Sequence, residues 1–384
     1  MPGDSYTPRE MIERLIAFDT TSRDSNLELI HFVQEYLGNL GIACTLIHDE
    51  TGAKANLFAT VGPQVDGGVV LSGHTDVVPV DGQDWHTDPF SVAERDGRLY
   101  GRGTSDMKSF SAIALALVPE MLARGLQRPV HFALSYDEEV GCLGAHSLVE
   151  HVGGLPVRPQ AVIVGEPTEM TVVNAHKGCH SYVTTVTGLE AHSSATHTGV
   201  NSIFYAAELI SFLHRQAQDL QTERNERYDP PYTTLHVGTV HGGTAQNIIP
   251  LETRFSWEFR VIPGHDADTL RAGFDRFAAE ELLPRMRAVH PDADIRTVQR
   301  ASVRALVPED GSPAETLVLA LAGSNQTFAA SYATEAGMFQ GGGVPTVICG
   351  PGSIREAHKP NEFIELTQID ACEAFLRRLI DHLA

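Results

Sequence analysis

The stretch VVLSGHTDVVP, residues 69–79, decides the fold. In it a short apolar run leads directly into a polar turn that carries His74. The pattern returns in AVIVGEP (161–167), where Glu166 follows the apolar run. Short apolar runs bounded by turns are typical of strands that are buried on both faces. Because helical stretches, clearest at 109–123, lie between such runs, the sequence predicts an α/β sheet with both faces covered.

Capping signals and further apolar runs extend this plan along the chain. The segment TPRE (7–10) predicts the start of a helix, since it combines a capping box with proline at the first helical position. A similar signal at 25–28 predicts a second helix start. Further strands are expected at 42–47, 56–61, 68–71, 130–135, 161–164 and 344–350, and a last amphipathic helix at 366–383.

The pattern of apolar and polar residues along the sequence changes at about residue 180. Strands are predicted at 181–188, 233–240, 254–262 and 294–298, and helices at 201–215 and 267–286. This order, β-α-β-β-α-β, is that of a ferredoxin-like α+β fold. We therefore expect 179–300 to form an inserted domain, while 1–178 and 301–384 together form a discontinuous catalytic domain.

Charge and composition restrict the class of protein. A chain of 384 residues exceeds the usual limit of one core, so two domains are expected. The net charge of -21 disfavours nucleic acid and anionic membranes as partners. The 5 cysteines are dispersed and form no C-x-x-C, which indicates reduced thiols in a cytoplasmic protein. No signal peptide or transmembrane stretch is expected, because the first residues lack a basic and an apolar region and no apolar run is long enough.

Five side chains of metal-binding types lie in turn-like contexts. Most of them follow a buried strand, and in open α/β sheets sites are built at the carboxyl ends of the strands. Residues distant in sequence can therefore meet at one edge of the sheet. Two imidazoles and three carboxylates suit a pair of divalent cations, and zinc is the commonest choice in hydrolases. The five residues are His74, Asp106, Glu139, Glu166 and His358.

Each of these positions also has an ordinary structural interpretation. Asp106 could be the N-cap of the helix predicted at 109–123. Glu138 and Glu139 could belong to an exposed acidic turn, and a lone loop histidine such as His192 is most often solvated. The joint occurrence of the set in one chain argues against these separate interpretations.

The functional interpretation gives these positions complementary chemistry. A carboxylate has two oxygens, so Asp106 can bridge two cations about 3.5–4 Å apart. Zinc lowers the pKa of its bound water to about 7, so one of Glu138 and Glu139 can hold metal while its neighbour takes a proton from that water. Asp76, two residues after His74, can accept the other ring N–H of the imidazole and fix its tautomer.

Six short motifs occur along the chain in the order HTDVVP, GRGTSDMK, DEE, GEPT, AHSS and HKP. With these motifs in this order, the chain resembles the dinuclear zinc amidohydrolases. That family includes aminoacylases, glutamate-releasing carboxypeptidases, succinyl-diaminopimelate desuccinylases and acetylornithine deacetylases. The resemblance covers nearly the whole chain, and GGTAQNIIP, ATEAGMFQ and GPGSIREAHKPNEFI look closest to the last of these groups. It implies a zinc-peptidase-like catalytic domain with a covered mixed sheet, an inserted lid and dimerisation domain, and hydrolysis of a small N-acyl amino acid, with N2-acetyl-L-ornithine as the expected substrate.

The resemblance also implies the ligand set of two zinc ions per chain, for which Co²⁺ is a possible substitute. His74 and Glu166 hold one zinc ion, Glu139 and His358 hold the other, and Asp106 bridges the pair.

Further roles follow from the same resemblance. Glu138 is the general base, and Asp76 orients His74. His192 polarises the scissile carbonyl and in the family often comes from the partner subunit, so a homodimer through 179–300 is expected. The substrate-binding candidates, among which arginine is suited to a carboxylate by its planar fork, are Asn247, Arg260 and Thr334.

Two positions depart from the expected family pattern, and two other functions stay open. Ser109 stands where glycine is expected after DMK, and His241 stands where glutamine is expected before Gly-Gly. Both departures bear on substrate choice and neither on the ligand set. The alternatives are another N-acyl amino acid hydrolase, such as a desuccinylase or aminoacylase, and a non-catalytic, metal-stabilised binding or assembly protein. Glu138 argues against the latter, because a non-catalytic relative need not keep the base.

Overall fold

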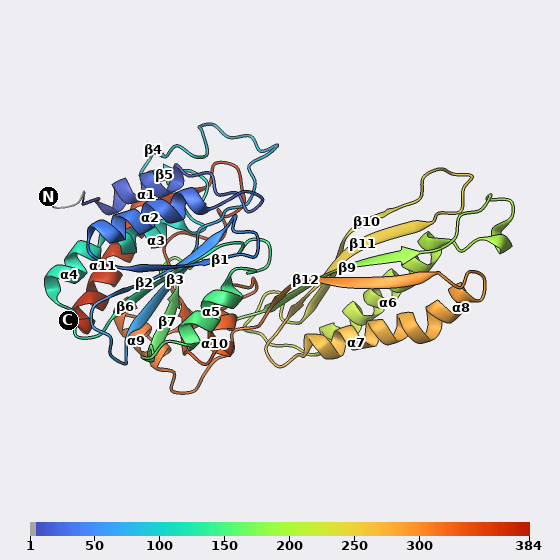
Figure 1. Cartoon of the computed structure of the whole chain (residues 1–384). Helices are drawn as coiled ribbons and strands as arrows, with labels where there is room; N and C mark the ends of the chain where they lie inside the picture. Colours follow the sequence, from blue (N-terminus) through green and yellow to red (C-terminus); the bar gives the residue numbers. More distant parts are fainter. Residues whose placement is uncertain (1–4) are drawn as a thin grey trace. The chain divides into compact units, whose positions relative to one another are not determined.

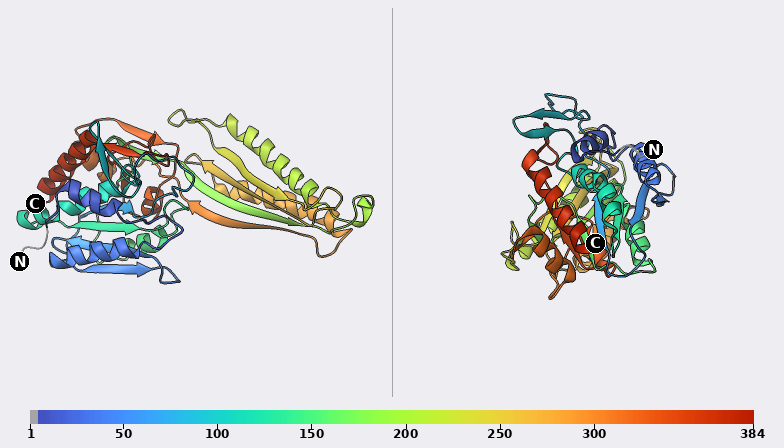
Figure 2. Two further views of the ribbon diagram at one scale, coloured as in Figure 1. Left: turned by 90° about the horizontal axis from the view of Figure 1, so that it is seen from above. Right: turned by 90° about the vertical axis from the view of Figure 1, so that its left-hand side faces the viewer.

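The computed structural model describes residues 5–384, which form two compact units. Unit 1 comprises the described residues up to Ala175 together with Leu306–Ala329 and Thr334–Ala384. Unit 2 comprises His176–Ala305 and Ala330–Ala333. Figure 1 shows the course of the chain, and Figure 2 gives two further views.

Unit 1 is built on a mixed eight-stranded sheet. Its middle strands β6, β3, β7 and β14 are neighbours and run parallel, so their carboxyl ends reach the same edge. These strands are buried throughout, which is why they appear in the sequence as unbroken apolar runs. In spatial order the strands are β1 (Cys44–His48), β2 (Ala55–Val61), β6 (Val130–Ser135), β3 (Val69–His74), β7 (Ala161–Val164), β14 (Thr346–Ile348), β8 (Val172–His176) and β13 (Thr327–Ala330).

Helices cover both faces of this sheet, as predicted. One face packs against a large apolar core. The helices of that core are α1 (Pro8–Ile16), α2 (Leu27–Asn39), α3 (Lys108–Ala116), α4 (Val118–Arg124), α9 (Pro313–Ala322) and α11 (Leu366–Leu383). The other face is covered by α5 (Ala145–Gly153) and α10 (Ala336–Gly341), which contact each other and the strands β2, β6, β7 and β14. A small sheet of β4 (Ala93–Arg95), β5 (Arg98–Tyr100) and β15 (Phe363–Glu365) completes the unit.

The helix starts agree only in part with the capping signals. α1 begins at Pro8, and its N-cap Thr7 forms the complete capping box, which confirms that prediction. α2 begins after Asn26, whose side chain makes no cap; instead the Ser25 hydroxyl accepts a hydrogen bond from the amide of Leu27. The predicted helix at 109–123 is two helices, because Pro119 follows the break between α3 and α4 and cannot supply the N–H that a continuous helix needs.

Unit 2 is a four-stranded antiparallel sheet with helices on one face, and its chain order is the predicted β-α-β-β-α-β. The strands are β10 (Thr234–Gly242), β11 (Glu252–Val261), β9 (Gly178–Thr187) and β12 (Asp294–Val303), in this spatial order. The covering helices are α6 (Ser202–Asp219) and α7 (Ala267–Phe277), the latter continued by a π-helical turn (Ala278–Leu282) and α8 (Leu283–Arg287). Short 3₁₀ turns lie at Thr196–Thr198 and Leu220–Thr222.

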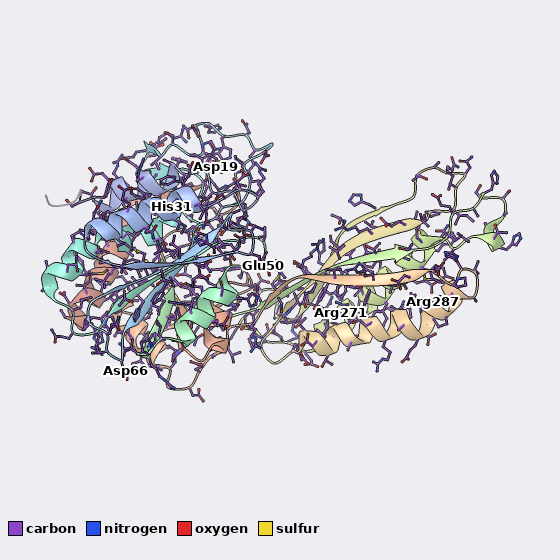
Figure 3. All side chains as sticks on the ribbon, in the orientation of Figure 1. Asp19, His31, Glu50, Asp66, Arg271 and Arg287 are labelled. Atoms are coloured by element: carbon purple, nitrogen blue, oxygen red, sulfur yellow. The ribbon has the colours of Figure 1, made fainter. Side chains whose placement is uncertain are left out.

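Charged side chains lie on the outside of both units. Asp19, Glu50 and Asp66 are exposed on unit 1, and Arg287 is exposed at the end of α8 on unit 2, where it pairs with Asp294 at 3.3 Å (Figure 3). Within residues 5–384, no helix is both long and apolar enough to cross a membrane.

Candidate metal centre

The strand ends of unit 1 bring most of the candidate ligands to one edge. His74 is the last residue of β3, Glu139 lies in the turn after β6, and Glu166 lies two residues beyond β7. Asp106 comes from the turn before α3, and His358 lies in the loop between β14 and β15 with a φ of 64°, a left-handed conformation. The parallel order of β6, β3 and β7 therefore explains how residues far apart in sequence meet.

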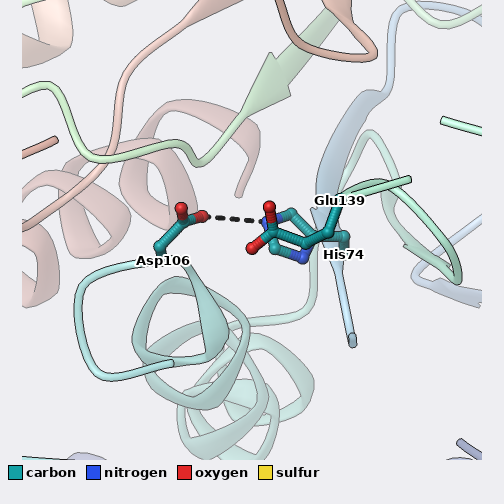
Figure 4. A group of neighbouring side chains, drawn as sticks. All are labelled: His74, Asp106 and Glu139. Atoms are coloured by element: carbon teal, nitrogen blue, oxygen red, sulfur yellow. Dashed lines mark hydrogen bonds and ion pairs between the residues drawn. The ribbon is translucent and has the colours of Figure 1, made fainter. Parts of the chain in front are cut away.

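Asp106 lies between the two histidines and directs one oxygen toward each of them. Its Oδ1 is 3.0 Å from Nε2 of His74, and its Oδ2 is 3.2 Å from Nε2 of His358. Glu139 completes the second side, with Oε2 3.0 Å from Nε2 of His358. Figure 4 shows His74, Asp106 and Glu139 together, with a dashed line joining the Asp106 carboxylate to the His74 ring. A carboxylate placed in this way is suited to bridging two cations.

Glu166 and Glu138 lie on the His74 side of the site. Oε1 of Glu166 is 3.8 Å from Nε2 of His74. Ligand atoms lie within 4.8 Å of one another in each of two overlapping groups. The first group is His74, Asp106 and Glu139, and the second is His74, Glu138 and Glu166. The described residues thus contain two adjacent sets of nitrogen and oxygen donors.

The electrostatics of the site reflect many carboxylates in a buried space. Burial, together with repulsion from neighbouring carboxylates, raises the pKa of Glu138 to about 8 and that of Glu139 to about 7. Burial and the charge of Asp106 likewise raise the pKa of Glu166 well above its usual value. The hydrogen bonds with Asp106 and Glu139 raise the pKa of His358 to about 10.

This donor set fits a pair of divalent cations. Without a cation, the carboxylates of Glu138, Glu139 and Glu166 repel each other and hold protons more tightly than usual. Cations at the same place would offset that repulsion, and imidazole nitrogens with carboxylate oxygens are the donors that zinc accepts.

Two of the ordinary structural interpretations are wrong. The N-cap of α3 is Met107, and no side chain caps that helix end, so the Asp106 carboxylate is not used as a cap. The side chain of Glu139 is only 6% exposed, so this residue does not belong to a solvated acidic turn.

Asp76 organises the site more broadly than the motif indicates. Its main-chain carbonyl lies 2.9 Å from Nδ1 of His74, whereas its carboxylate is 3.6 Å from that atom. The carboxylate instead accepts hydrogen bonds from the amides of Glu138 and Glu139, at 3.0 and 3.3 Å, and from the hydroxyl of Ser22 at 2.6 Å. One residue thereby links the first histidine to the acidic pair.

His192 and the proposed substrate-binding residues do not belong to these strand ends. In unit 2, His192 is exposed, and its segment forms an isolated antiparallel bridge with Ile248, next to Asn247. Arg260 lies on β11, with Nε 2.9 Å from Oε1 of Glu258. Thr334 is in unit 1 and fully buried, and its hydroxyl accepts a hydrogen bond from the amide of Ala336.

The sequence interpretation missed three side chains that contact the site or its supports. The thiol of Cys142 donates to Oε1 of Glu138 at 3.3 Å. Glu335, at the start of α10, accepts from the hydroxyls of Ser72 and Ser135, near the ends of β3 and β6. Glu362 accepts from main-chain amides around Asp106. A buried carboxylate leaves no periodic signal, although the charged residues inside GRGTSD and HKPNEF could have suggested a pair.

Comparisons with known proteins identify the class of this protein. The model of the family described as Peptidase family M20/M25/M40 matches residues 70–382. The chain belongs to this family, and it is an enzyme of the metal-dependent hydrolase class.

Particular relatives are similar over almost the whole chain. The chain is 35% identical to an acetylornithine deacetylase from Myxococcus xanthus, with 97% of each chain covered. It is 34% identical to an acetylornithine deacetylase from Proteus mirabilis, with 95% of this chain and 92% of the relative covered.

Solved structures share the fold at lower identity. An M20 family metallo-carboxypeptidase from Sulfolobus solfataricus superposes with a TM-score of 0.77 at 17% identity, covering 97% of this chain and 98% of that one. A dinuclear metal binding peptidase of the M20 family from Bacillus subtilis superposes with a TM-score of 0.63 at 16% identity, covering 98% of each. These structures confirm the predicted architecture of a mixed-sheet catalytic domain with a separate smaller antiparallel sheet.

Proposed function

We propose that the protein hydrolyses N2-acetyl-L-ornithine to acetate and L-ornithine, as a cytoplasmic enzyme of arginine biosynthesis. The observation that carries the reaction type is the placement of Asp106 between His74 and His358, with Glu138 beside them. The substrate is supported by the acetylornithine deacetylases that match the chain at 34–35% identity.

We assign the ligands of two zinc ions to this centre. His74 and Glu166 would hold one ion, Glu139 and His358 would hold the other, and Asp106 would be shared. When bound, zinc supplies an activated water molecule and a positive charge for the developing oxyanion. Zinc analysis of the reconstituted protein should approach two ions per chain; full activity with one ion at saturation would contradict the bridging role of Asp106.

The residues of this chain then move the proton and bind the substrate. Glu138 takes a proton from the attacking water and passes it to the leaving amine, as a general base and then a general acid. His192 stabilises the oxyanion. Asn247 and Arg260 bind the α-carboxylate of the substrate, and Thr334 is a further contact. We also propose a homodimer through unit 2.

The reaction is tested by comparing substrates. Initial rates of the zinc-loaded protein should be measured side by side on N2-acetylornithine, N-succinyl-diaminopimelate and N-acetylmethionine. The largest kcat/KM is expected for N2-acetylornithine. A larger kcat/KM for N-succinyl-diaminopimelate would instead support a desuccinylase activity. A larger kcat/KM for N-acetylmethionine would instead support an aminoacylase activity. No hydrolysis of any of the three, by protein that binds zinc, would favour a binding or assembly function.

The role of the unit 2 residues is tested by kinetics. Arg260→Ala is expected to raise KM more than it lowers kcat, since a carboxylate contact is made in the ground state and the transition state alike. His192→Ala is expected mainly to lower kcat, because the oxyanion exists only during the reaction.

If His192 acts across a dimer, mixing His192→Ala with Glu138→Gln should restore part of the activity. No recovery in proven mixed dimers would exclude action in trans.

A further inference from the structure

Glu362 lies outside the ligand set, but it contacts the segment that carries Asp106. It is the residue before Phe363, where β15 begins, and it is 1% exposed. Its Oε1 accepts three main-chain hydrogen bonds, from the amides of Gly103, Ser105 and Asp106, at 3.1, 2.8 and 3.0 Å. A single oxygen therefore holds the turn from which the Asp106 carboxylate projects.

The second oxygen of Glu362 pairs with a buried arginine. Oε2 lies 2.6 Å from a guanidinium nitrogen of Arg102, which is also 1% exposed. Another nitrogen of Arg102 donates to Oε1 of Gln83 at 2.7 Å. The amide of Gln83 in turn donates to the main-chain carbonyl of His358 at 2.9 Å. The carboxylate, the guanidinium and the amide form a continuous chain of contacts between the two ligand-bearing loops.

We propose that Glu362 is a positioning residue which, with Arg102 and Gln83, fixes the bridging carboxylate of Asp106 relative to His358. The inference rests on the two-metal centre of the proposed function. Asp106 and His358 come from two segments of unit 1 that are separated in the sequence by unit 2, and neither lies on a strand of the central sheet. The strands alone consequently do not set the distance between them, whereas this contact chain does. Partners behind the ligands commonly tune metal affinity in this way.

The chemistry of the position requires a carboxylate. Glutamate offers acceptor oxygens on both sides, one for the three amides and one for the guanidinium. Glutamine has one acceptor oxygen and one NH₂ donor, so in either orientation a donor meets a donor. It would also leave the buried charge of Arg102 without its partner. Glu362→Gln thus disturbs the contact chain with almost no change in shape.

The test compares four variants, Glu362→Gln, Glu362→Asp, Gln83→Ala and the control Glu365→Gln, with the wild-type protein by titrating the metal-free forms with Co²⁺. Glu362→Gln breaks the contact chain. Glu362→Asp keeps the charge opposite Arg102 but is one methylene too short to reach all three amides. The matched control is Glu365→Gln, because Glu365 lies on the same segment and makes an exposed pair with Arg98 at 3.3 Å. The readouts are stoichiometry, affinity of each equivalent by calorimetry, the visible Co²⁺ spectrum and thermal unfolding of the metal-free protein.

Glu362→Gln is expected to fold and to bind at least one of the two equivalents of Co²⁺ about 10- to 100-fold more weakly than the wild type. Its Co²⁺ spectrum is expected to change as well. Glu362→Asp should recover thermal stability more than metal affinity. Glu365→Gln should match the wild type in every readout. A milder variant, Gln83→Ala, should weaken only the equivalent held by His358 and leave the other unchanged.

Several outcomes would overturn the assignment. Affinities and spectra equal to the wild type, with only a lower unfolding temperature, would make Glu362 a structural residue. Loss of the folded state in both Glu362 variants would lead to the same conclusion, since the pair would then maintain the whole unit. If the wild-type protein itself bound no Co²⁺, the metal centre of the proposed function would fail, which is a distinct result.

Discussion

At the scale of single residues, the adjacent Glu138 and Glu139 can have different roles because the Asp76 carboxylate accepts hydrogen bonds from both of their main-chain amides. Asp76 accepts from the main-chain N–H groups of Glu138 and Glu139, which fixes the turn in which they lie. Glu139 then contacts His358, while the carboxylate of Glu138 accepts a hydrogen bond from Cys142. The turn thus directs one carboxylate to the second histidine and leaves its neighbour available for the proposed role of general base.

Glu138→Gln is the sharpest test of this division. The substitution keeps the shape of the side chain and removes its basicity, so kcat should fall by about 10²–10⁴ while the zinc content is unchanged. Activity and metal analysis of the same preparation measure both effects. The control is Glu150→Gln, an exposed position on α5. Loss of metal from Glu138→Gln would mean that the roles of Glu138 and Glu139 are exchanged.

His131 on β6 allows a pH prediction away from the metal centre. Burial lowers its pKa to about 4, whereas a histidine in an unfolded chain has a pKa of about 6.5. Below pH 6.5, His131 binds a proton in the unfolded chain but stays neutral in the folded protein. The stability that neutral His131 contributes is therefore present above pH 6.5 and is lost as the pH falls toward 4.

The prediction is tested with His131→Asn, which stays neutral throughout this range. Between pH 7 and pH 4, the difference in free energy of unfolding between wild type and variant should shift by roughly 3 kcal/mol in favour of the variant. Urea unfolding of the metal-free proteins at several pH values measures it. A difference that stays constant with pH would show that the ring has the same pKa in the folded protein as in the unfolded chain.

The position of a side chain could be predicted from the sequence where the side chain stands in a recognisable local setting. His74 and Glu166 are at or just past the end of an apolar run, and the structure places them at one sheet edge. Glu362 and Arg102 could not be paired in the same way. Their partnership depends on β15 pairing with β5, a contact between segments 260 residues apart that no local pattern encodes.

At the scale of elements, the end of β7 requires glycine. A Cβ atom on Gly165 would lie 2.0 Å from ring atoms of Phe110 on α3, which packs directly against the strand end. This close approach brings the turn with Glu166 near α3 and the preceding Asp106. The VG and SG endings of the apolar runs 161–165 and 69–73 thus reflect packing as well as turn formation.

Gly165→Ala is expected to destabilise the protein by about 1–3 kcal/mol through overpacking and to weaken zinc binding, because Glu166 must shift. Thermal unfolding with and without zinc measures both effects. The control is Gly38→Ala in α2, where a Cβ atom meets nothing within 4 Å and alanine is the better helix former. A neutral Gly165→Ala would show that Phe110 can move aside without cost.

Elements that the sequence did not reveal share a physical reason. The short strands β8 and β13 and the helices α5, α9 and α10 were not predicted, since most have few residues and depend on neighbours for their burial. Long periodic segments such as α11 and α6 were predicted correctly, because their own pattern of apolar residues is sufficient.

At the scale of the whole molecule, the candidate ligands all belong to unit 1. Removing metal should therefore loosen that unit selectively. Hydrogen exchange after chelation is expected to rise in the loops around 103–107, 136–144, 165–170 and 351–361, and to stay unchanged in the strands of unit 2. Readdition of zinc should reverse the effect. Equal increases in both units would indicate that metal supports the global stability of the chain instead.

The position of β14 has a consequence for how the protein is made. This strand lies between β7 and β8 in the sheet, yet it is encoded after the whole of unit 2. Between Val164 and Thr346 the ribosome adds 346 − 164 = 182 residues, which takes roughly 10–35 s at bacterial and eukaryotic elongation rates. During that time the nascent β7 presents an unpaired apolar edge while unit 2 is already emerging. Slow elongation before residue 346 should therefore favour aggregation or chaperone capture of the nascent chain, a vulnerability set by topology rather than by the stability of the finished enzyme.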